Sequence, residues 1–368
     1  MEILCRYLHT YYNTNILKLL PPAYQKIFRE AALKNKKNVK ANSALIRLVN
    51  NLYTGALPTP DYVSGPFTLS YHFSEYHRKS IYVFGELHGT ENECSEFPQS
   101  RKNSMEMPEF LERTFENTPV FIDFYMEMFP HLGEHPYEKI ERATTVDPTY
   151  LNRIRAKVFN CTFQRKECGW RETMRAHWTD PRYADEHFAN IATSREPKIS
   201  LSKRETDELK KIQFLKRKPR EFADFIMEEL KKNKFVSKEM KKSTLSFNEF
   251  REIIVSFLER FPVREDREIS KKMKRSNVVV ILLNLHALVL DAYQLSRIFK
   301  RFSSGPNSKQ PEEPHYIISY AGDAHSFFLR VALDYLNFSK KEAVKFKDIK
   351  NLRCTKVKGF VPLFKDVF

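Results

Sequence analysis

Several residues and patterns that define common protein classes are rare or absent in this chain of 368 residues. It has only 9 glycines and 2 tryptophans, so each glycine calls for a positional reason. The longest apolar run, residues 278–290, contains Asn284 and His286 and is shorter than the about 20 residues that cross a bilayer. We interpret the run as a buried element and His286 as a core histidine.

Cysteine pairs and nucleotide-binding motifs are also missing. The five cysteines are odd in number and show no CxxC spacing, which predicts reduced thiols in a cytosol-like compartment and no zinc-cysteine site. The first 20 residues lack the apolar core of a secretory signal, so we expect a protein that is not secreted. The absence of P-loop, GxGxxG, HExxH and GxSxG patterns removes the usual support for nucleotide binding and serine hydrolysis.

Charge is abundant and unevenly distributed. The formal net charge is +16, which predicts attraction to polyanions such as nucleic acid or an anionic membrane. Residues 1–50 hold nine Lys/Arg and two Asp/Glu. They predict a basic helical arm over 1–66, which is either a solvated helical face or a docking arm for nucleic acid or a larger assembly. Residues 81–140 reverse the sign, with twelve Asp/Glu against four Lys/Arg, which suits a cation site or an acidic solvated helix at 104–117.

Hydrophobic periodicity predicts an α/β fold. Its central sheet should be mostly parallel and flanked by helices, with a large helical insertion and the basic helical N-terminal arm. Residues 67–368 would form this α/β core, with the insertion at about 184–275. Residues 278–299 favour one long helix, although 278–280 alone are typical of a strand. The other expected elements are strands at 80–84, 120–126 and 315–320 and helices at 105–115 and 324–336.

Two Gly-x-x-His corners follow predicted strands, GELH at 85–88 and GDAH at 322–325. Chance alone would give about 0.3 such matches in a chain of this composition. We expect each glycine to permit a sharp turn, so that His88 and His325 project over the edge of the sheet, where open α/β sheets bind ligands. Glu86 and Asp323 follow the glycines directly and suit a ligand, a base or an acceptor that fixes the imidazole tautomer.

Glu127 supplies a third component of this candidate site. It ends the run VFIDFYME and should lie at the same sheet edge as the two histidines if the strands are parallel. His88, Glu127 and His325 could then hold a divalent metal ion (Mn, Zn, Co or Fe) that lowers the pKa of a bound water. The alternative is that both histidines are satisfied helix-start or core residues and that Glu127 is a surface carboxylate.

A further cluster lies in RETMRAHWTDPRY, residues 171–183. Its Arg175, His177, Asp180 and Arg182 could bind an anionic substrate group, because the guanidinium fork matches carboxylate and phosphate. The alternative is a structural ion-pair loop.

The order of GELH, Glu127 and GDAH resembles the TIKI/TraB/ChaN/erythromycin-esterase superfamily. The combination with RAHWTDPR and DAYQLSR (291–297) is similar to uncharacterised proteins of large DNA viruses. The resemblance implies an α/β core with His88, Glu127 and His325 at the site and Glu86 beside them. Several members of that superfamily are metal-dependent hydrolases, and ChaN-like members bind haem iron.

The leading hypothesis is therefore a metal-dependent hydrolase in which Glu86 or Asp323 takes a proton from bound water and Arg175 or Arg182 orients an unknown substrate. The rival is a basic structural or virion protein, such as a minor capsid or core-associated protein, with an inactive hydrolase-like core. Its partners would be virion proteins or nucleic acid on the basic surface. The expected location is the cytoplasm of an infected cell or the virion.

Overall fold

The computed structural model describes most of the chain from residue 60 onward. The expected arm over residues 1–59 lies outside the described residues. Those described are 60–87, 94, 103–118, 120–127, 149–163, 170, 173–179, 198–261, 269–302, 310–342, 354–361, 363 and 364.

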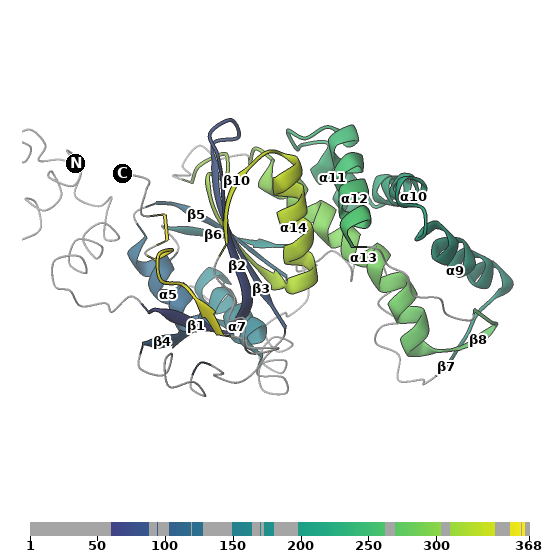
Figure 1. The fold of residues 1–368 in the computed structure, drawn as a ribbon, viewed down its shortest axis with the longest axis horizontal. Coiled ribbons are helices and arrows are strands. Elements are labelled where there is room, and N and C mark those ends of the chain that lie inside the picture. Colours follow the sequence, from purple (N-terminus) through teal and green to yellow (C-terminus); the bar gives the residue numbers. More distant parts are fainter. Residues whose placement is uncertain are drawn as a thin grey trace, which may run out of the picture.

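A six-stranded sheet organises one half of the molecule (Figure 1). Three of its pairings, β3–β9, β9–β5 and β5–β6, are parallel, whereas β10–β2 and β2–β3 are antiparallel. The α/β expectation is confirmed, and the sheet is mixed, with parallel pairs at its centre. In spatial order its strands are β10 (Ser339–Glu342), β2 (Pro66–Ser74), β3 (Lys79–Glu86), β9 (Tyr316–Gly322), β5 (Ile122–Met126) and β6 (Met174–Trp178).

The central strands are buried on both faces. All residues of β3 and β5 are buried, as is usual for parallel strands covered by helices on either side. Tyr82 and Phe84 of β3 face one core cluster, whereas Ile81 and Val83 of the same strand face the other. The alternation of side chains along a strand thus supplies two separate cores from a single apolar run.

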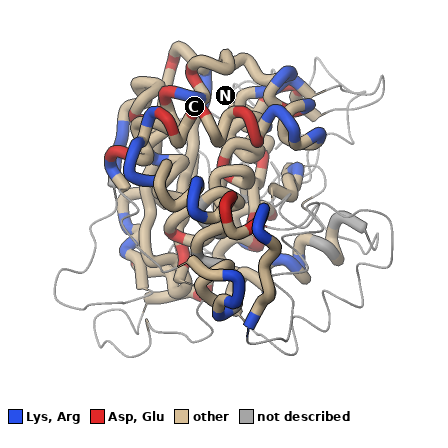
Figure 2. The backbone as a smooth tube through the Cα atoms, turned by 90° about the vertical axis from the view of Figure 1, so that its right-hand side faces the viewer, with Lys and Arg blue, Asp and Glu red and all other residues tan. Residues whose placement is uncertain are grey.

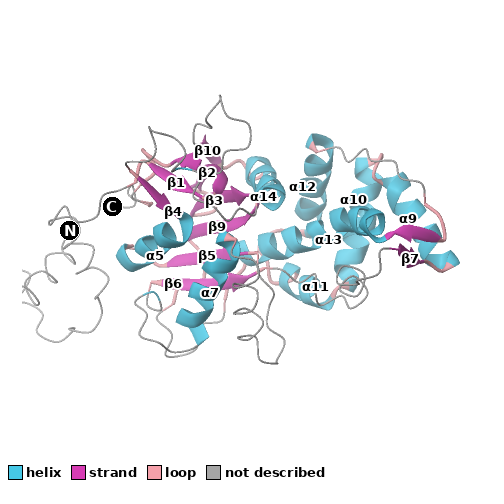
Figure 3. Ribbon diagram, turned by 90° about the horizontal axis from the view of Figure 1, so that it is seen from below, coloured by secondary structure: helices cyan, strands magenta, loops and turns pink. Residues whose placement is uncertain are grey.

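Helices cover the two faces of the sheet (Figure 3). The core cluster on one face includes residues of α5 (Met107–Asn117) and α7 (Tyr150–Phe163). The cluster on the other face includes residues of α13 (Arg275–Ile298) and α14 (Asp323–Tyr335). The long helix predicted over 278–299 is therefore present, and 278–280 belong to it. No helix within the described ranges is long and apolar enough to cross a membrane.

A helical lobe fills the other half of the molecule, where the sequence predicts the insertion (Figures 1 and 3). Local signals set its helix ends: capping boxes start α9 at Ser202 and α12 at Ser246, and Pro219 opens α10. Helix α13 runs from this lobe to the sheet and contacts both α9 and α14. The lobe contains α9 (Lys203–Leu215), α10 (Pro219–Lys232), α11 (Lys234–Met240), α12 (Phe247–Arg260) and the two-stranded ribbon of β7 (Lys198–Ser200) and β8 (Lys272–Lys274).

Three local expectations differ from the structure. Residues 62–64, assigned to the arm, form β1 (Tyr62–Ser64), which pairs with β4 (Ser104–Glu106) and β11 (Cys354–Lys356). Residues 174–178, expected in a loop, form β6. The prediction of reduced cysteines is wrong for Cys94 and Cys354, which form a disulfide across a sequence separation of 260 residues. Cys161 is also disulfide-bonded.

Candidate functional site

The chain connections single out the carboxyl end of β9 as the place for a site. The strand on one side, β3, is followed by α5 on one face of the sheet, whereas β9 is followed by α14 on the opposite face. Neighbouring strands whose connections leave on opposite faces open a crevice at their carboxyl ends, and open α/β sheets bind ligands there. The register pairs Glu86 with Gly322 and Tyr320 with Met126, so the ends of β3, β9 and β5 share this edge.

Three polar side chains meet at this edge, and we call them the edge cluster: Glu127, Asp291 and His325. His325 Nδ1 lies 2.7 Å from Asp291 Oδ1, and His325 Nε2 lies 3.7 Å from Glu127 Oε1. The three come from the end of β5, from α13 and from the first turn of α14. Two carboxylates thus lie against one imidazole, and carboxylates attract a nearby cation.

Glu127 is fixed in place by its backbone as well as its side chain. Its Oε2 accepts a hydrogen bond of 3.0 Å from the backbone N–H of Gly322, at the start of α14. Arg155 of α7 donates from Nε to the carbonyl oxygen of Glu127 at 3.0 Å. Glu127 is buried, so the expectation of a surface carboxylate does not describe it. One carboxylate oxygen thus satisfies a helix N-terminus, and the other faces His325.

Asp323 points away from His325, toward β2. It accepts hydrogen bonds from Thr68 and, at 3.4 Å, from Arg330 Nη1.

Gly85, which packs against Asp323, does not adopt a left-handed turn but lies within β3. A Cβ atom at residue 85 would lie 3.1 Å from the Cα of Asp323, so glycine here allows close approach of α14 to the sheet. The expectation that Gly85 makes a sharp turn is therefore wrong.

Glu86 is almost fully buried, with 1% of its surface exposed, and accepts a hydrogen bond from the Tyr320 hydroxyl. Burial and the Glu86 carboxylate hold the pKa of Tyr320 well above its ordinary value. The phenol therefore keeps its proton and remains a donor to Glu86 near neutral pH.

Three predicted site residues lie outside the described residues: His88, Asp180 and Arg182. The roles expected for them at the edge cluster remain predictions.

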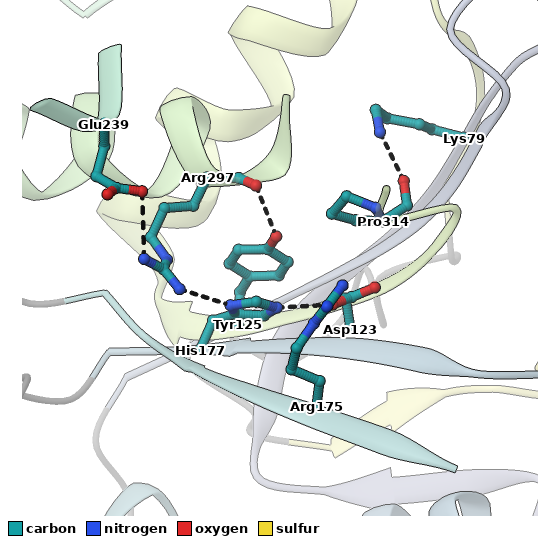
Figure 4. A network of polar contacts seen from close by, with 8 residues as sticks. All are labelled: Lys79, Asp123, Tyr125, Arg175, His177, Glu239, Arg297 and Pro314. Carbon is teal, nitrogen blue, oxygen red and sulfur yellow. Dashed lines mark hydrogen bonds and ion pairs between the residues drawn. The ribbon is translucent and has the colours of Figure 1, made fainter. Parts of the chain in front are cut away.

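Arg175 and His177 belong to a second cluster (Figure 4). We call it the mid-sheet network and define it as Asp123, Arg175, His177, Glu239 and Arg297. Asp123 Oδ1 accepts from Arg175 Nε at 2.6 Å and from His177 Nε2 at 2.7 Å. On the other side of the ring, Arg297 Nη2 donates to His177 Nδ1 at 3.1 Å. Arg297 also forms an ion pair with Glu239 of α11. The network therefore joins β5 and β6 to the helices α11 and α13.

Burial sets the protonation state of this histidine. It lowers the pKa of His177 to about 4, and the hydrogen bond from its ring to Asp123 opposes this only in part. At neutral pH the ring is thus uncharged, with Nε2–H donating to Asp123 and Nδ1 accepting from Arg297. The contacts of Arg175 and His177 are those of the alternative prediction, a structural ion-pair cluster. They lie in strand β6 and not in a loop.

Two residues of the site were missed by sequence reasoning, Asp291 and Arg155. Asp291 carries a signal, because it is the first acidic residue after the apolar run 278–290 on a buried helix. Charged residues are seldom buried without a partner, so its position called for one. Arg155 lies among several half-buried polar residues of α7, and no sequence pattern distinguishes it.

The described side chains offer only part of a metal site. Within these residues, no group of three or more His, Cys, Asp or Glu side chains is arranged to hold a metal ion. His325 and Glu127 could supply two ligands, and a third would have to come from His88 or from solvent.

Comparison with protein-family models, with curated proteins and with solved structures gave no match to this chain.

Proposed function

We propose that this protein is a metal-dependent hydrolase of the TIKI/TraB/erythromycin-esterase-like type, acting through a metal- or base-activated water at the edge cluster. The observation that carries the proposal is the separation of 3.7 Å between His325 Nε2 and Glu127 Oε1. Two ligands of one ion, with bonds of about 2.0–2.2 Å and angles between tetrahedral and trigonal, lie roughly 3.3–3.8 Å apart. The pair therefore suits a shared divalent cation (Mn, Zn, Co or Fe).

Asp291 supports this role as a positioning residue. An ionised carboxylate only accepts, so the 2.7 Å contact makes His325 Nδ1 the donor. The remaining nitrogen, Nε2, lies toward Glu127 and would be the atom that ligates a bound cation. A carboxylate that holds the far nitrogen of a metal-binding histidine is a common arrangement, because it fixes the ring and its tautomer.

A divalent ion at this place would supply a bound water of lowered pKa. Both carboxylates proposed as proton acceptor have hydrogen-bond donors in this structure: Asp323 accepts from Thr68 and Arg330, and Glu86 accepts from Tyr320. Glu86 and Asp323 both remain candidates for that role. Arg175 loses its support as a substrate-orienting group, because its Nε donates to Asp123. Arg182 keeps that role as a proposal.

The test is metal retention by the full-length protein. After dialysis against metal-free buffer and reloading with Mn²⁺, Zn²⁺, Co²⁺ or Fe²⁺, the wild type should keep about one ion per chain. His325→Ala and Glu127→Gln should lose it and should also lose hydrolysis of ester and peptide probes. His315→Ala is the matched control, because His315 contacts the Arg78 carbonyl at the opposite edge of the sheet.

Two results would contradict the proposal. One is a wild type that retains none of the four metals, and the other is retention by His325→Ala and Glu127→Gln equal to that of wild type. Circular dichroism of each variant establishes that the fold is intact.

The second candidate, a basic interaction protein with an inactive core, is favoured by a different observation. Glu127 already has a structural partner, since it satisfies the start of α14 through the Gly322 N–H. On this hypothesis Glu127→Gln would lower the stability of the protein without changing its metal content.

A further inference from the structure

The helical lobe ends in a surface that we call the basic tip: Lys198, Lys203, Arg204, Lys271, Lys272 and Lys274. It is formed by the β7–β8 ribbon, by Lys271 directly before β8 and by the first turn of α9. Figures 1 and 3 show the ribbon at the end of the lobe away from the sheet. The basic tip is therefore separate from the edge cluster, and a role for it is independent of the proposed hydrolase.

Positive charge is concentrated there, and Glu205 is the acidic residue in the first turn of α9. Residues 198–204 hold three Lys/Arg and residues 269–276 hold four, and neither segment contains Asp or Glu. The six side chains of the basic tip are exposed, and none forms a salt bridge with another described residue. Elsewhere on the lobe, by contrast, Lys218, Lys231 and Lys232 pair with glutamates three residues away. Figure 2 looks at this side of the molecule and shows more blue than red along the backbone.

The ribbon's register brings like charges together. Lys198 lies opposite Lys274, and Ser200 lies opposite Lys272. These four residues share the outer face of the ribbon and are exposed, whereas Met273 on the inner face is buried in the core and Ile199 packs against it. Like charges directly opposite one another destabilise an antiparallel pair. An anionic partner across this face would remove that cost.

We propose that the basic tip binds the phosphate backbone of a double-stranded nucleic acid. Six exposed cations on a short ribbon and an adjoining helix start match a row of phosphates. Single strands are bound with exposed aromatic rings, and membrane surfaces with exposed apolar side chains. The large apolar side chains that the described residues expose, such as Phe214 and Phe235, all lie outside the basic tip. The lack of aromatic and large apolar side chains among the six residues of the basic tip thus favours a duplex over both alternatives.

The test measures binding of the full-length protein to fluorescent 25-bp duplexes of DNA and of RNA by anisotropy, at 50 to 200 mM salt. We expect binding to weaken steeply with salt, with a slope of log affinity against log salt of about −5 if all six cations contact phosphates. The triple variant Lys198→Gln/Lys272→Gln/Lys274→Gln should reduce affinity at least about tenfold and flatten the slope by about 3.

The matched control is Lys234→Gln/Lys238→Gln/Lys241→Gln, which removes the same charge from exposed positions on and beside α11. It should change duplex affinity by less than about threefold, through net charge alone. Three results would overturn the proposal: no duplex binding by the wild type at 50 mM salt, equal losses in the two triple variants, or tighter binding to phosphatidylserine vesicles than to either duplex.

Discussion

The mid-sheet network and the edge cluster both place a histidine between the sheet and α13, but they differ in charge and in distance. In the mid-sheet network, His177 is hydrogen-bonded through both ring nitrogens, and Arg175, Arg297 and Lys300 outnumber Asp123 and Glu239. In the edge cluster, one imidazole faces two carboxylates, the second at 3.7 Å. A histidine therefore stabilises the packing of the mid-sheet network, whereas the histidine of the edge cluster, on our proposal, binds a cation.

Helix α13 connects the two regions. Asp291, Gln294 and Arg297 follow one another at intervals of three residues and so lie on one side of the helix. They contact His325, Ser319 and His177, respectively. One polar stripe on a largely buried helix thus aligns the lobe with the sheet and orients the candidate metal ligand. Matched substitutions along this stripe and its partners can test whether the two regions really differ.

The largest effect is expected from Asp123→Asn in the mid-sheet network. The carboxylate is fully buried and is the shared acceptor for Arg175 and His177. Its neutralisation leaves the guanidinium of Arg175, whose side chain is 15% exposed, without this counter-ion, and the loss should approach the about 3–5 kcal/mol typical of a broken buried ion pair. Urea denaturation should show this loss in the free energy of unfolding. A loss below about 1 kcal/mol would mean that the network does not hold the lobe to the sheet.

Acidification should weaken the same network. The pKa of His177 is lowered from 6.5 to about 4 by burial, so the unfolded state binds this proton first as the pH falls. The contribution of the neutral ring to the free energy of unfolding is present above pH 6.5 and is lost as the pH falls toward 4. The expected loss is about 2 kcal/mol between pH 6.5 and 4.5. His177→Gln removes the titration and should flatten the stability profile in this window. An unchanged profile would contradict a neutral, buried His177.

Gly85→Ala tests the close packing of the start of α14 against β3. The added Cβ would lie 3.1 Å from the Asp323 Cα, a backbone atom at the start of α14 that cannot move alone. We expect a loss of about 1–3 kcal/mol in the free energy of unfolding. Gly359→Ala serves as the comparison. Its Cβ would meet nothing within 4 Å, but the φ of residue 359 is +91°, so a loss of stability there would come from backbone strain and not from a steric clash. A stability equal to wild type for Gly85→Ala would show that α14 can move away from β3 at little cost.

Asp291→Asn makes in the edge cluster the same chemical change as Asp123→Asn makes in the mid-sheet network. It should cost less stability than Asp123→Asn, which leaves the guanidinium of Arg175 without its carboxylate. Metal affinity should fall at least tenfold, about 1.4 kcal/mol, because the amide no longer holds His325 as firmly. Calorimetric titration with Mn²⁺ or Zn²⁺ measures it. Unchanged affinity would remove Asp291 from the metal site.

Much of the framework could be predicted from the sequence because its signals are local. The strands β3, β5 and β9 are apolar runs, and α13 and α14 follow helical spacing. The meeting of Glu127 and His325 follows from a general rule, since the carboxyl ends of parallel strands share an edge. Glycine spacing alone could not show that Gly85 serves packing, which depends on how closely α14 approaches β3.

The remaining features depend on partners that are distant in sequence. Strand β6 was missed because Arg175 and His177 make it look polar, and their partners Asp123 and Arg297 lie 52 and 120 residues away, respectively. The sequence position of Asp291 called for a partner, but only the packing of α13 against α14 shows that this partner is His325. The disulfide between Cys94 and Cys354 closes 260 residues, and spacing among five cysteines cannot specify such a pairing.

The most direct test of the proposed metal site is anomalous diffraction from crystals of the full-length protein soaked in Mn²⁺ or Zn²⁺, recorded at the absorption edge of the metal. We predict one peak about 2.0–2.3 Å from both His325 Nε2 and Glu127 Oε1, which is lost in crystals of His325→Ala. A peak elsewhere in the chain, or no peak while His325 and Glu127 keep their separation, would contradict it.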